Sequence, residues 1–398
     1  MATADLAGPR RDHWLDRATL IGLLAFGGAL QFSIFLAETI LTLALIAWLA
    51  SLITQRERPE APPWFTPLLV YAGLTLVATA FSMDRWASLG AAKQLLLFLI
   101  VPAAYRALRG RSAETAIDVV ISLGAFSAIV GVIQFGFLGY DRLQQRPVGT
   151  LGHYMTYSGL LMLIICSVVA RLLFSRRDRV WPALVLPALV VALVFTFTRS
   201  AWVGACVGVG LLLILKDFRL LALAPVVAGL FFALAPSSLT SRFYSIFDLK
   251  DPSNRDRVAM FQAGTGIIAS DPLTGVGPNV VQQVYPQYRK ATAVEQTPPH
   301  LHNVPMQIAA ERGLPALGVW IWFVVSAIRG LLLRMRSGGR ALYLSAGGLA
   351  SMGAMIAAGF FEYNFGDSEF LLLLLLLLTL PWAAARAAAP APGRQPAA

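Results

Sequence analysis

His302 has the sequence surroundings of a general base. It lies in the segment HLHNVP, in which Asn303 can cap a helix and Pro305 would occupy the first helical turn. The positive end of that helix dipole disfavours imidazolium, so we expect the ring of His302 to be neutral and able to accept a proton. A capping or packing role is the alternative for His302. His300 is a weaker candidate because it precedes the helix by more residues.

Five arginines are candidates for binding an anion with two phosphate groups. Arg199 lies in FTFTRSAWVG between two apolar runs. Arg142 and Arg146 lie in a short loop that we predict on the outer, non-cytoplasmic side of the membrane. Arg255 and Arg257 are two residues apart, so at most one is expected to face the apolar side of its helix, and Arg257 is our choice. Guanidinium groups bind pyrophosphate in a bidentate manner and can stabilise it as a leaving group without a metal. The alternative is that these side chains extend toward lipid head groups.

The composition is that of a membrane protein. The chain has 398 residues, of which 57% are hydrophobic and 13% are charged, about half the charged fraction of a typical soluble domain. Its mean hydropathy is +0.67. These values exclude a soluble globular protein, and the two cysteines are too few for a secreted disulfide scaffold. Basic cytoplasmic loops explain the net charge of +11 better than binding to nucleic acid does.

Apolar runs predict an all-α protein with about twelve transmembrane helices. Residues 18–54 are long enough for two spans, with a tight turn near Gln31–Ser33. The other predicted spans are residues 64–81, 87–106, 113–138, 153–174, 180–198, 201–215, 219–236, 304–332, 341–361 and 368–386. When the N-terminus is assigned to the cytoplasm, most Lys and Arg residues of the short loops fall on the cytoplasmic side. Both termini are then cytoplasmic.

The predicted organisation has five parts. They are a cytoplasmic tail (residues 1–17), transmembrane helices 1–9 (18–236), a long periplasmic loop with short helices (237–303), transmembrane helices 10–12 (304–386) and a disordered cytoplasmic tail (387–398). Long loops are exempt from the charge rule, so the cations of residues 237–303 do not contradict this topology.

The first part of the long loop predicts an amphipathic helix. Ser253 or Asn254 can cap its start. Val258, Phe261 and Ile268 recur at roughly helical spacing and predict the face that lies against the membrane or the helix bundle.

Two further segments leave alternatives open. The glycines of DPLTGVGPN could bring backbone N–H groups close to an anion, but a tight outer turn is the favoured interpretation. The last predicted hairpin contains three acidic residues, Glu362, Asp367 and Glu369. A solvated acidic turn is the simplest interpretation. The alternative is that they balance the charge of the cationic loop or bind sugar hydroxyls. The sequence has no HExxH, CxxC or Walker A motif, so neither a metal site nor a cofactor is predicted.

These motifs together resemble the O-antigen ligase and polymerase superfamily. FTFTRSAWVG resembles its Thr-x-Ser/Thr-Arg signature, and NRDRVAMFQAG resembles its Arg-x-x-x-Trp/Phe element. DPLTGVGPN resembles its Pro-Leu-x-Gly-Val-Gly turn, and HLHNVPMQIAAERGLPAL resembles its His-Asn-x-x-Leu/Met-Gln element. RPVGTLGHYMTYSG resembles a further family segment. The resemblance covers about residues 60–385, and it departs from the pattern at Phe261, where tryptophan is commoner.

The resemblance implies a lipid-linked glycan transferase of the bacterial inner membrane, with a fold similar to polyprenyl-dependent (GT-C-like) glycosyltransferases. The donor would be a glycan on undecaprenyl pyrophosphate, and in the ligase branch the acceptor would be lipid A–core. His302 would be the general base, and Arg199 and Arg257 would bind the pyrophosphate, with Arg142 or Arg146 as helpers. No metal or other cofactor is expected.

Three other functions stay open from the sequence. A polymerase of O-antigen or exopolysaccharide repeats would use the same chemistry with a different acceptor. A protein O-oligosaccharyltransferase is less consistent with this chain, because those relatives usually carry a longer C-terminal region. A transporter or flippase for anionic lipids would place charges along a midplane path and often shows two similar halves, whereas here the candidate residues gather on one side.

Overall fold

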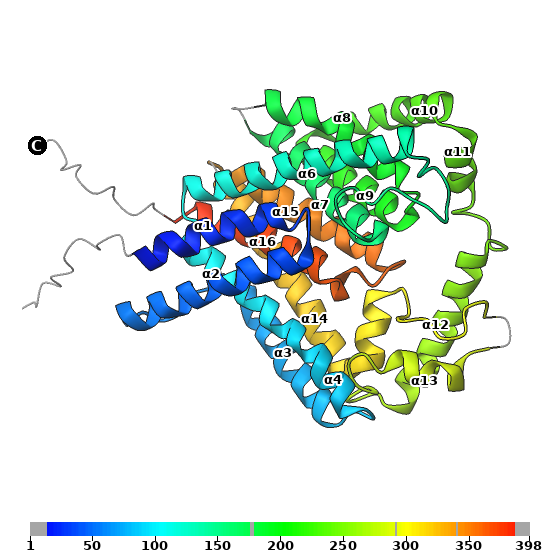
Figure 1. Ribbon diagram of the computed structural model, residues 1–398, viewed down its shortest axis with the longest axis horizontal. Helices are drawn as coiled ribbons and strands as arrows, with labels where there is room; N and C mark the ends of the chain where they lie inside the picture. Colours follow the sequence, from blue (N-terminus) through cyan, green and yellow to red (C-terminus); the bar gives the residue numbers. More distant parts are fainter. Residues whose placement is uncertain (1–13, 176–178, 291–292, 340, 387–398) are drawn as a thin grey trace, which may run out of the picture.

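The computed structural model describes residues 14–175, 179–290, 293–339 and 341–386, and in these residues the protein is all-helical (Figure 1). They contain no β-strand, only an isolated bridge between Arg142 and Gln145. The prediction of an all-α fold is therefore confirmed. The predicted tails over residues 1–13 and 387–398 lie outside the described residues, whereas residues 14–17 already belong to the first helix.

The helices follow one another in a simple order. The first half of the chain forms α1 (Trp14–Ala29), α2 (Ile34–Gln55), α3 (Phe65–Ala80), α4 (Arg85–Ala92), the 3-10 helix η1 (Lys93–Leu99), α5 (Ile100–Ala107), α6 (Arg111–Phe137), α7 (Tyr154–Phe174), α8 (Val180–Phe195) and α9 (Arg199–Asp217). The second half forms η2 (Phe218–Leu223), α10 (Ala224–Leu234), α11 (Ser237–Tyr244), α12 (Pro252–Ser270), α13 (Val281–Tyr288), α14 (Val304–Ser337), α15 (Ala341–Gly359), η3 (Asn364–Gly366) and α16 (Ser368–Ala384).

The protein is a multi-pass membrane protein by the length and composition of its helices. Within the described residues, six helical segments are long and apolar enough to cross a membrane. They are Ile34–Gln55, Arg85–Ala107, Arg111–Phe137, Tyr154–Phe174, Val304–Ser337 and Leu342–Gly359. Three shorter apolar helices are Phe65–Ala80, Val180–Phe195 and Ser368–Ala384. Every predicted range contains helix, but the number of twelve spans stays a prediction. The expected turn near Gln31–Ser33 does separate α1 from α2, and Ser33 caps α2.

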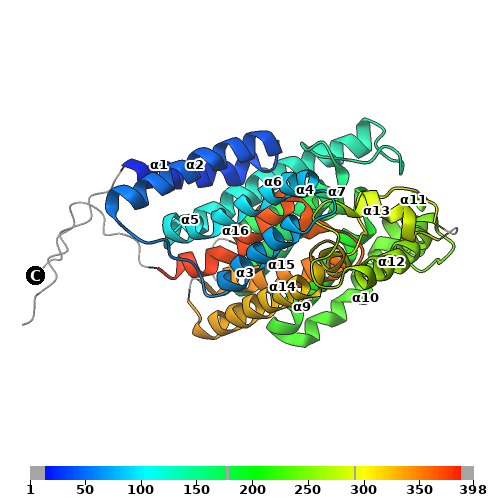
Figure 2. The same cartoon turned by 90° about the horizontal axis from the view of Figure 1, so that it is seen from below.

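The centre of the bundle consists of α7, α15 and α16. The leucines of residues 371–378 in α16 are all buried, as is most of α7. Helix α9 approaches α15 closely because Gly204 and Gly208 face the carbonyl oxygens of Ala354 and Ala350. Small residues at such contacts allow tight packing of apolar helices. Helices α1 and α2 pair along one edge of the bundle (Figure 2).

The two ends of the bundle differ in their charges and in what covers them. At one end, Arg106 forms ion pairs with Asp16 and Glu57, and Arg386 with Glu60. This is the end at which α1 begins (Figure 1). Helices α11, α12 and α13 lie at the opposite end, where they cover the ends of α9 and α14.

The apolar face of α12 differs from the predicted one. Val258 and Phe261 are exposed, while Met260, Ala263 and Ile267 pack with α13 and the start of α14 in a second, smaller core. Of the predicted stripe, Ile268 is partly buried against this core, and contact of Val258 and Phe261 with the membrane stays a prediction. The capping residue is also different: Asp251 accepts hydrogen bonds from the N–H groups of Ser253 and Asn254, and Pro252 occupies the first turn.

The DPLTGVGPN turn binds to α14 at a kink in that helix. Gly313 has φ 79° and ψ 170°, which interrupts the helix before Pro315. The freed carbonyl groups of Ala310 and Glu311 accept hydrogen bonds from Val276 N (2.9 Å) and Gly277 N (3.0 Å). These glycine-rich N–H groups are used to bind the helix, so the structure favours the tight-turn interpretation of this motif over anion binding.

Replacing Gly313 should destabilise this junction. Its positive φ strains any L side chain, and a Cβ atom would lie 2.1 Å from Leu273 O. We expect Gly313→Ala to cost at least about 1–3 kcal/mol, seen as a lower midpoint of thermal unfolding in detergent. Gly318→Ala in the same helix is the matched control, because its Cβ would meet nothing within 4 Å. Equal midpoints for the two variants would contradict this role of Gly313.

Candidate active site

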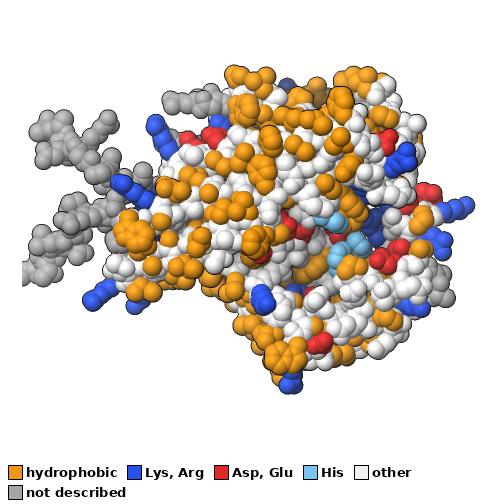
Figure 3. All heavy atoms as spheres, viewed as in Figure 1, with side chains coloured by type: hydrophobic (Ala, Val, Ile, Leu, Met, Phe, Trp, Pro, Cys, Tyr) orange, Lys and Arg blue, Asp and Glu red, His pale blue; other side chains and the backbone are white. Residues whose placement is uncertain are grey.

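Four arginines line one cavity at the end of the bundle that α11–α13 cover. The cavity has a volume of about 150 Å³, and its lining includes Arg146, Arg199, Arg242 and Arg257 together with His302. These residues come from the segment before α7 and from α9, α11, α12 and the segment before α14. Figure 3 shows histidine side chains beside basic and acidic ones in a hollow of this face.

Arg199 is placed by an unusual backbone at the start of α9. Phe197, two residues earlier, is buried and has φ 54°, and Thr198 returns the chain to an extended conformation. The guanidinium is only 4% exposed. Its Nη1 donates to Ser245 O (2.7 Å) and Ser245 Oγ (2.9 Å), and its Nη2 lies 3.1 Å from Asp251 Oδ1. Arg199 is thus fixed before any ligand binds.

Asp251 connects this arginine to the helix that carries Arg257. The same carboxylate that pairs with Arg199 caps the first turn of α12. Its other oxygen, Oδ2, lies 3.8 Å from Nη1 of Arg242, whose Nε donates to Phe197 O at 3.3 Å. One carboxylate therefore sets the relative positions of α9, α11 and α12.

Arg257 and Arg146 close the cavity from two other sides. Arg257 Nε donates to Phe361 O (3.2 Å), and its guanidinium lies 6.0 Å from the centre of the Phe361 ring. Arg146 Nε donates to Leu143 O (2.8 Å), and its guanidinium stacks on Tyr154 at 4.3 Å. The other nitrogen atoms of both guanidinium groups take part in none of these hydrogen bonds, so they can serve a ligand.

The positive charges of the arginines around the cavity repel one another. Burial lowers the pKa of Arg146 and Arg257, and the positive charge of Arg199 lowers both further. Burial and the charges of Arg199 and Arg146 lower the pKa of Arg242 to about 10. These groups still carry their charges at neutral pH. An anion in the cavity would relieve the repulsion, which is the physical requirement for strong anion binding.

His302 is held by a buried carboxylate at the edge of the same cavity. Its Nδ1 lies 3.0 Å from Glu362 Oε2, and the carboxylate is fixed in turn by the N–H of Tyr363. A carboxylate only accepts, so Nδ1 carries the proton and Nε2 keeps its lone pair in the neutral ring. His302 has φ 47°, a left-handed conformation for a residue other than glycine. Such backbone strain is common at functional sites.

The second histidine completes a compact group of donors. His300 Nε2 lies 3.5 Å from Glu362 Oε1, and the two imidazole rings are 4.3 Å apart. Burial lowers the pKa of His300 to about 4, so it is neutral at neutral pH. Burial alone would raise the pKa of Glu362, but the hydrogen bond and charge of His302 and the charge of His300 lower it to about 2. One ligand atom from each of the three side chains lies within 4.8 Å of the others, so they could hold a metal ion.

The structure brings together most of the predicted site residues. Arg199, Arg257, Arg146 and His302 line the arginine cavity, and His300 lines the adjoining one. Two predicted residues lie elsewhere. Arg142 has an 80% exposed side chain and faces Asp141, and Arg255 is exposed on the other side of α12.

Sequence reasoning missed Arg242 and Asp251, and it gave Glu362 no definite role. Nothing in the sequence separates Arg242 from the other cations of the long loop. Glu362 is not a solvated turn residue, because its side chain is 13% exposed and contacts both histidines. One feature of the sequence could have indicated Glu362: it is an acidic residue between aromatic residues, on the same predicted side of the membrane as His302.

Comparison with known families gives one match, which covers part of the chain. Residues 183–321 match the family model described as O-antigen ligase, and the range includes Arg199, Arg242, Asp251, Arg257 and His302. Over this range the resemblance to the O-antigen ligase and polymerase superfamily is confirmed. This region is therefore similar to a family of glycosyltransferase-like enzymes. No curated protein matches the chain.

The titration of His300 should make the protein less stable in acid. In the unfolded chain His300 takes up a proton near pH 6.5, but in the folded protein only near pH 4. The unfolded state binds more protons between these values, so stability falls as the pH falls from about 6.5 to about 4. In His300→Gln this decrease should be smaller, as measured by thermal unfolding across that pH range. An unchanged decrease would show that other groups cause it.

Proposed function

We propose that the protein is an O-antigen ligase, which transfers a glycan from undecaprenyl pyrophosphate to a sugar hydroxyl of lipid A–core. The observation that carries the proposal is the single cavity in which four arginines lie beside a carboxylate-held histidine. We place the site at the periplasmic face of the bacterial inner membrane, on a fold of twelve transmembrane helices similar to polyprenyl-dependent glycosyltransferases. The periplasmic location follows from the charges of the short loops.

The reaction requires one proton acceptor and one anion-stabilising group. Nε2 of His302 takes the proton of the acceptor hydroxyl as its oxygen forms a bond to the anomeric carbon. The bond from that carbon to the pyrophosphate oxygen breaks, and the electron pair leaves with undecaprenyl pyrophosphate. Attack and departure on opposite faces invert the anomeric configuration.

The arginine cavity supplies the stabilisation of the leaving group. Arg257 and Arg146 have nitrogen atoms free for phosphate oxygens, and Arg199 and Arg242 contribute fixed positive charge. Preorganised charges of this kind act most strongly where negative charge develops in the transition state. We therefore propose a metal-independent reaction, in which guanidinium groups perform the task that a divalent cation performs in other glycosyltransferases.

Glu362 is a positioning residue in this proposal. Its hydrogen bond to Nδ1 keeps the tautomer of His302 that leaves Nε2 free, and its charge stabilises the imidazolium that forms. The left-handed backbone at His302 helps to direct the ring toward the carboxylate.

The arginines can be tested with a matched pair on α12. Arg257→Gln should lower kcat by about a hundredfold, equivalent to about 3 kcal/mol of lost transition-state stabilisation. Arg255→Gln removes an exposed cation two residues away and should leave kcat within about twofold. The measurement is release of undecaprenyl pyrophosphate by the purified protein in liposomes that contain donor and acceptor. Equal losses in both variants would contradict the assignment of Arg257.

The same assay separates the proposed function from its alternatives. Product found on lipid A–core supports a ligase, whereas lengthened donor glycan indicates a polymerase. A transporter would release no undecaprenyl pyrophosphate. Loss of activity after chelation of divalent metals would contradict the metal-independent mechanism and would direct attention to His300, His302 and Glu362 as ligands.

The histidine and its carboxylate should differ in their kinetic signatures. His302→Ala should abolish transfer, with a loss of about 10²–10⁴-fold or more. Glu362→Gln should lower kcat by about ten- to a hundredfold, because a hydrogen bond to a charged group contributes about 1.5–3 kcal/mol. Glu362→Asp keeps the carboxylate and should retain more of kcat than Glu362→Gln does. Equal kcat values for these two variants would contradict the positioning role of Glu362.

A further inference from the structure

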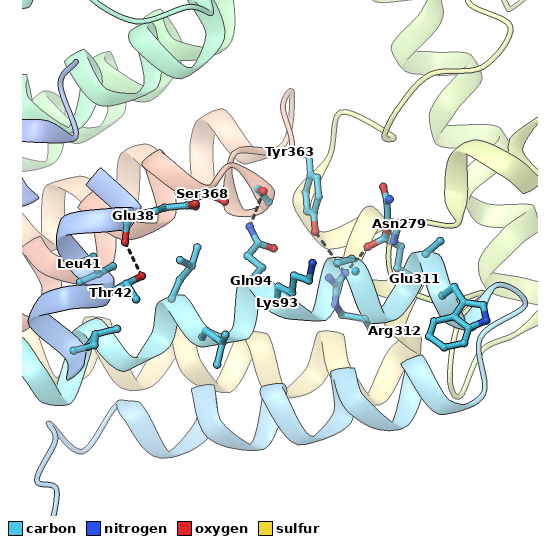
Figure 4. A pocket seen from close by; sticks show the side chains of 18 residues that line it. Glu38, Leu41, Thr42, Lys93, Gln94, Asn279, Glu311, Arg312, Tyr363 and Ser368 are labelled. Atoms are coloured by element: carbon cyan, nitrogen blue, oxygen red, sulfur yellow. Dashed lines mark hydrogen bonds and ion pairs between the residues drawn. The ribbon is translucent and has the colours of Figure 1, made fainter. Parts of the chain in front are cut away.

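A large cavity lies beside the candidate active site, between membrane-spanning helices and the turns at their ends. It has a volume of about 660 Å³ and is lined by α2, α4, η1, the start of α14 and the turn that contains η3. The apolar part of the lining includes Leu41, Leu45, Leu96 and Leu97. Glu38 and Thr42 lie beside Leu41, whereas Glu311 and Arg312 lie at the opposite end, which we call the polar end (Figure 4).

The polar end of this cavity carries two cations. Arg312 is 6% exposed and pairs with Glu311 through Nη1, but its Nε has no hydrogen-bond partner among the described residues. The Glu311 carboxylate also accepts hydrogen bonds from Asn279 N (2.7 Å) and Gln307 Nε2 (2.8 Å), and its negative charge balances that of Arg312. The Lys93 side chain points toward this end in Figure 4. Its ammonium makes no hydrogen bond or ion pair with any other described residue, which leaves net positive charge there.

Lys93 also occupies a special place in its helix. It is the first residue of η1, the 3-10 segment that interrupts the span Arg85–Ala107. A lysine inside a membrane span is costly unless it faces a polar partner or a cavity, and it is therefore a functional candidate. The other acidic residue of the lining, Glu38, lies on α2 at the opposite side of the cavity from Arg312 (Figure 4). The cavity is thus polarised rather than neutral throughout.

This cavity adjoins the candidate active site through a third one. The intervening cavity, of about 210 Å³, shares Tyr363 and Gly366 with the large cavity. It shares Met155 and Glu362 with the arginine cavity, and His300 lies in its wall. A molecule bound in the large cavity can therefore extend toward the histidines from the side away from the arginines.

We propose that the large cavity binds the acceptor as an amphiphile with a phosphate-bearing head group. The phosphate contacts Lys93 and Arg312, and the hydrocarbon chain lies along the leucines of α2 and η1. The leucine-lined part suits an acyl chain and not a free phosphate ion, because burial of apolar surface against it is favourable. The role as acceptor rests on the proposed function, whereas binding of the lipid does not.

A binding experiment tests the site without the reaction. Purified protein in detergent is titrated with dioleoyl phosphatidic acid, and binding is measured by native mass spectrometry. Two controls are titrated in the same way. Dioleoylglycerol has the same chains without the phosphate, and inorganic phosphate lacks the chains. We expect phosphatidic acid to bind at least tenfold more tightly than either control. Competition by inorganic phosphate at the same concentration would overturn the proposal in favour of a simple anion site.

Three variants locate the lipid. Lys93→Gln should weaken phosphatidic acid binding at least tenfold. Arg85→Gln is the matched control, because Arg85 is an exposed cation of the same span that does not line the cavity, and its affinity should stay within twofold. Arg257→Gln should also bind normally. Loss of binding in Arg257→Gln but not in Lys93→Gln would place the lipid in the arginine cavity and overturn the proposal, as would equal losses in Lys93→Gln and Arg85→Gln.

Kinetics then test the role as acceptor. Lys93→Gln should raise KM for the lipid acceptor about tenfold and leave KM for the donor unchanged, whereas Arg257→Gln lowers kcat. If the wild-type protein transfers no glycan, the proposed function fails while the binding result stands on its own. If transfer occurs and Lys93→Gln leaves the acceptor KM unchanged, the acceptor assignment fails while the proposed function stands.

Discussion

The candidate site depends on the ion pair between Arg199 and Asp251. Both groups are largely buried, and removing one charge of such a pair costs about 3–5 kcal/mol because the other stays unpaired. Asp251 also caps α12 and faces Arg242, so three segments distant in the sequence are held by one carboxylate. Without it, Arg199 and Arg242, two of the four mutually repelling arginines, would lose their carboxylate partner. The charge of Asp251 thus holds these segments together and also reduces the repulsion among the arginines when no anion occupies the cavity.

A second constraint fixes the histidine end of the site. The kink at Gly313 frees carbonyl groups of α14, and the DPLTGVGPN turn uses them. These hydrogen bonds attach the segment before α13 to the first turns of α14. Helix α14 begins at Val304, directly after Asn303. The glycines of the motif therefore serve backbone packing rather than ligand binding, and their effect on His302 is indirect.

Much of the fold was predictable because apolar composition determines it. Spans such as 113–138 follow from hydropathy, and the cap at Asn303 follows from local chemistry. The face of α12 that packs in the second core was not predictable, because it depends on contacts with α13 and the start of α14 that the spacing within α12 does not specify. The same limit applied to the site. Arg199, Arg257 and His302 were found through motifs, but Asp251 and Glu362 act through contacts 52 and 60 residues away in the chain. Neither spacing nor periodicity contains that information.

The small size of the arginine cavity bears on how the polymer is handled. Its volume of about 150 Å³ is below the roughly 300–1,000 Å³ of pockets that enclose a whole ligand. In the proposed chemistry it can surround the diphosphate and little more, so distal saccharide units project into the aqueous compartment. Under that proposal the site contacts too little of the glycan to measure its length. The length distribution of the product would then be set by the earlier step that builds the polymer.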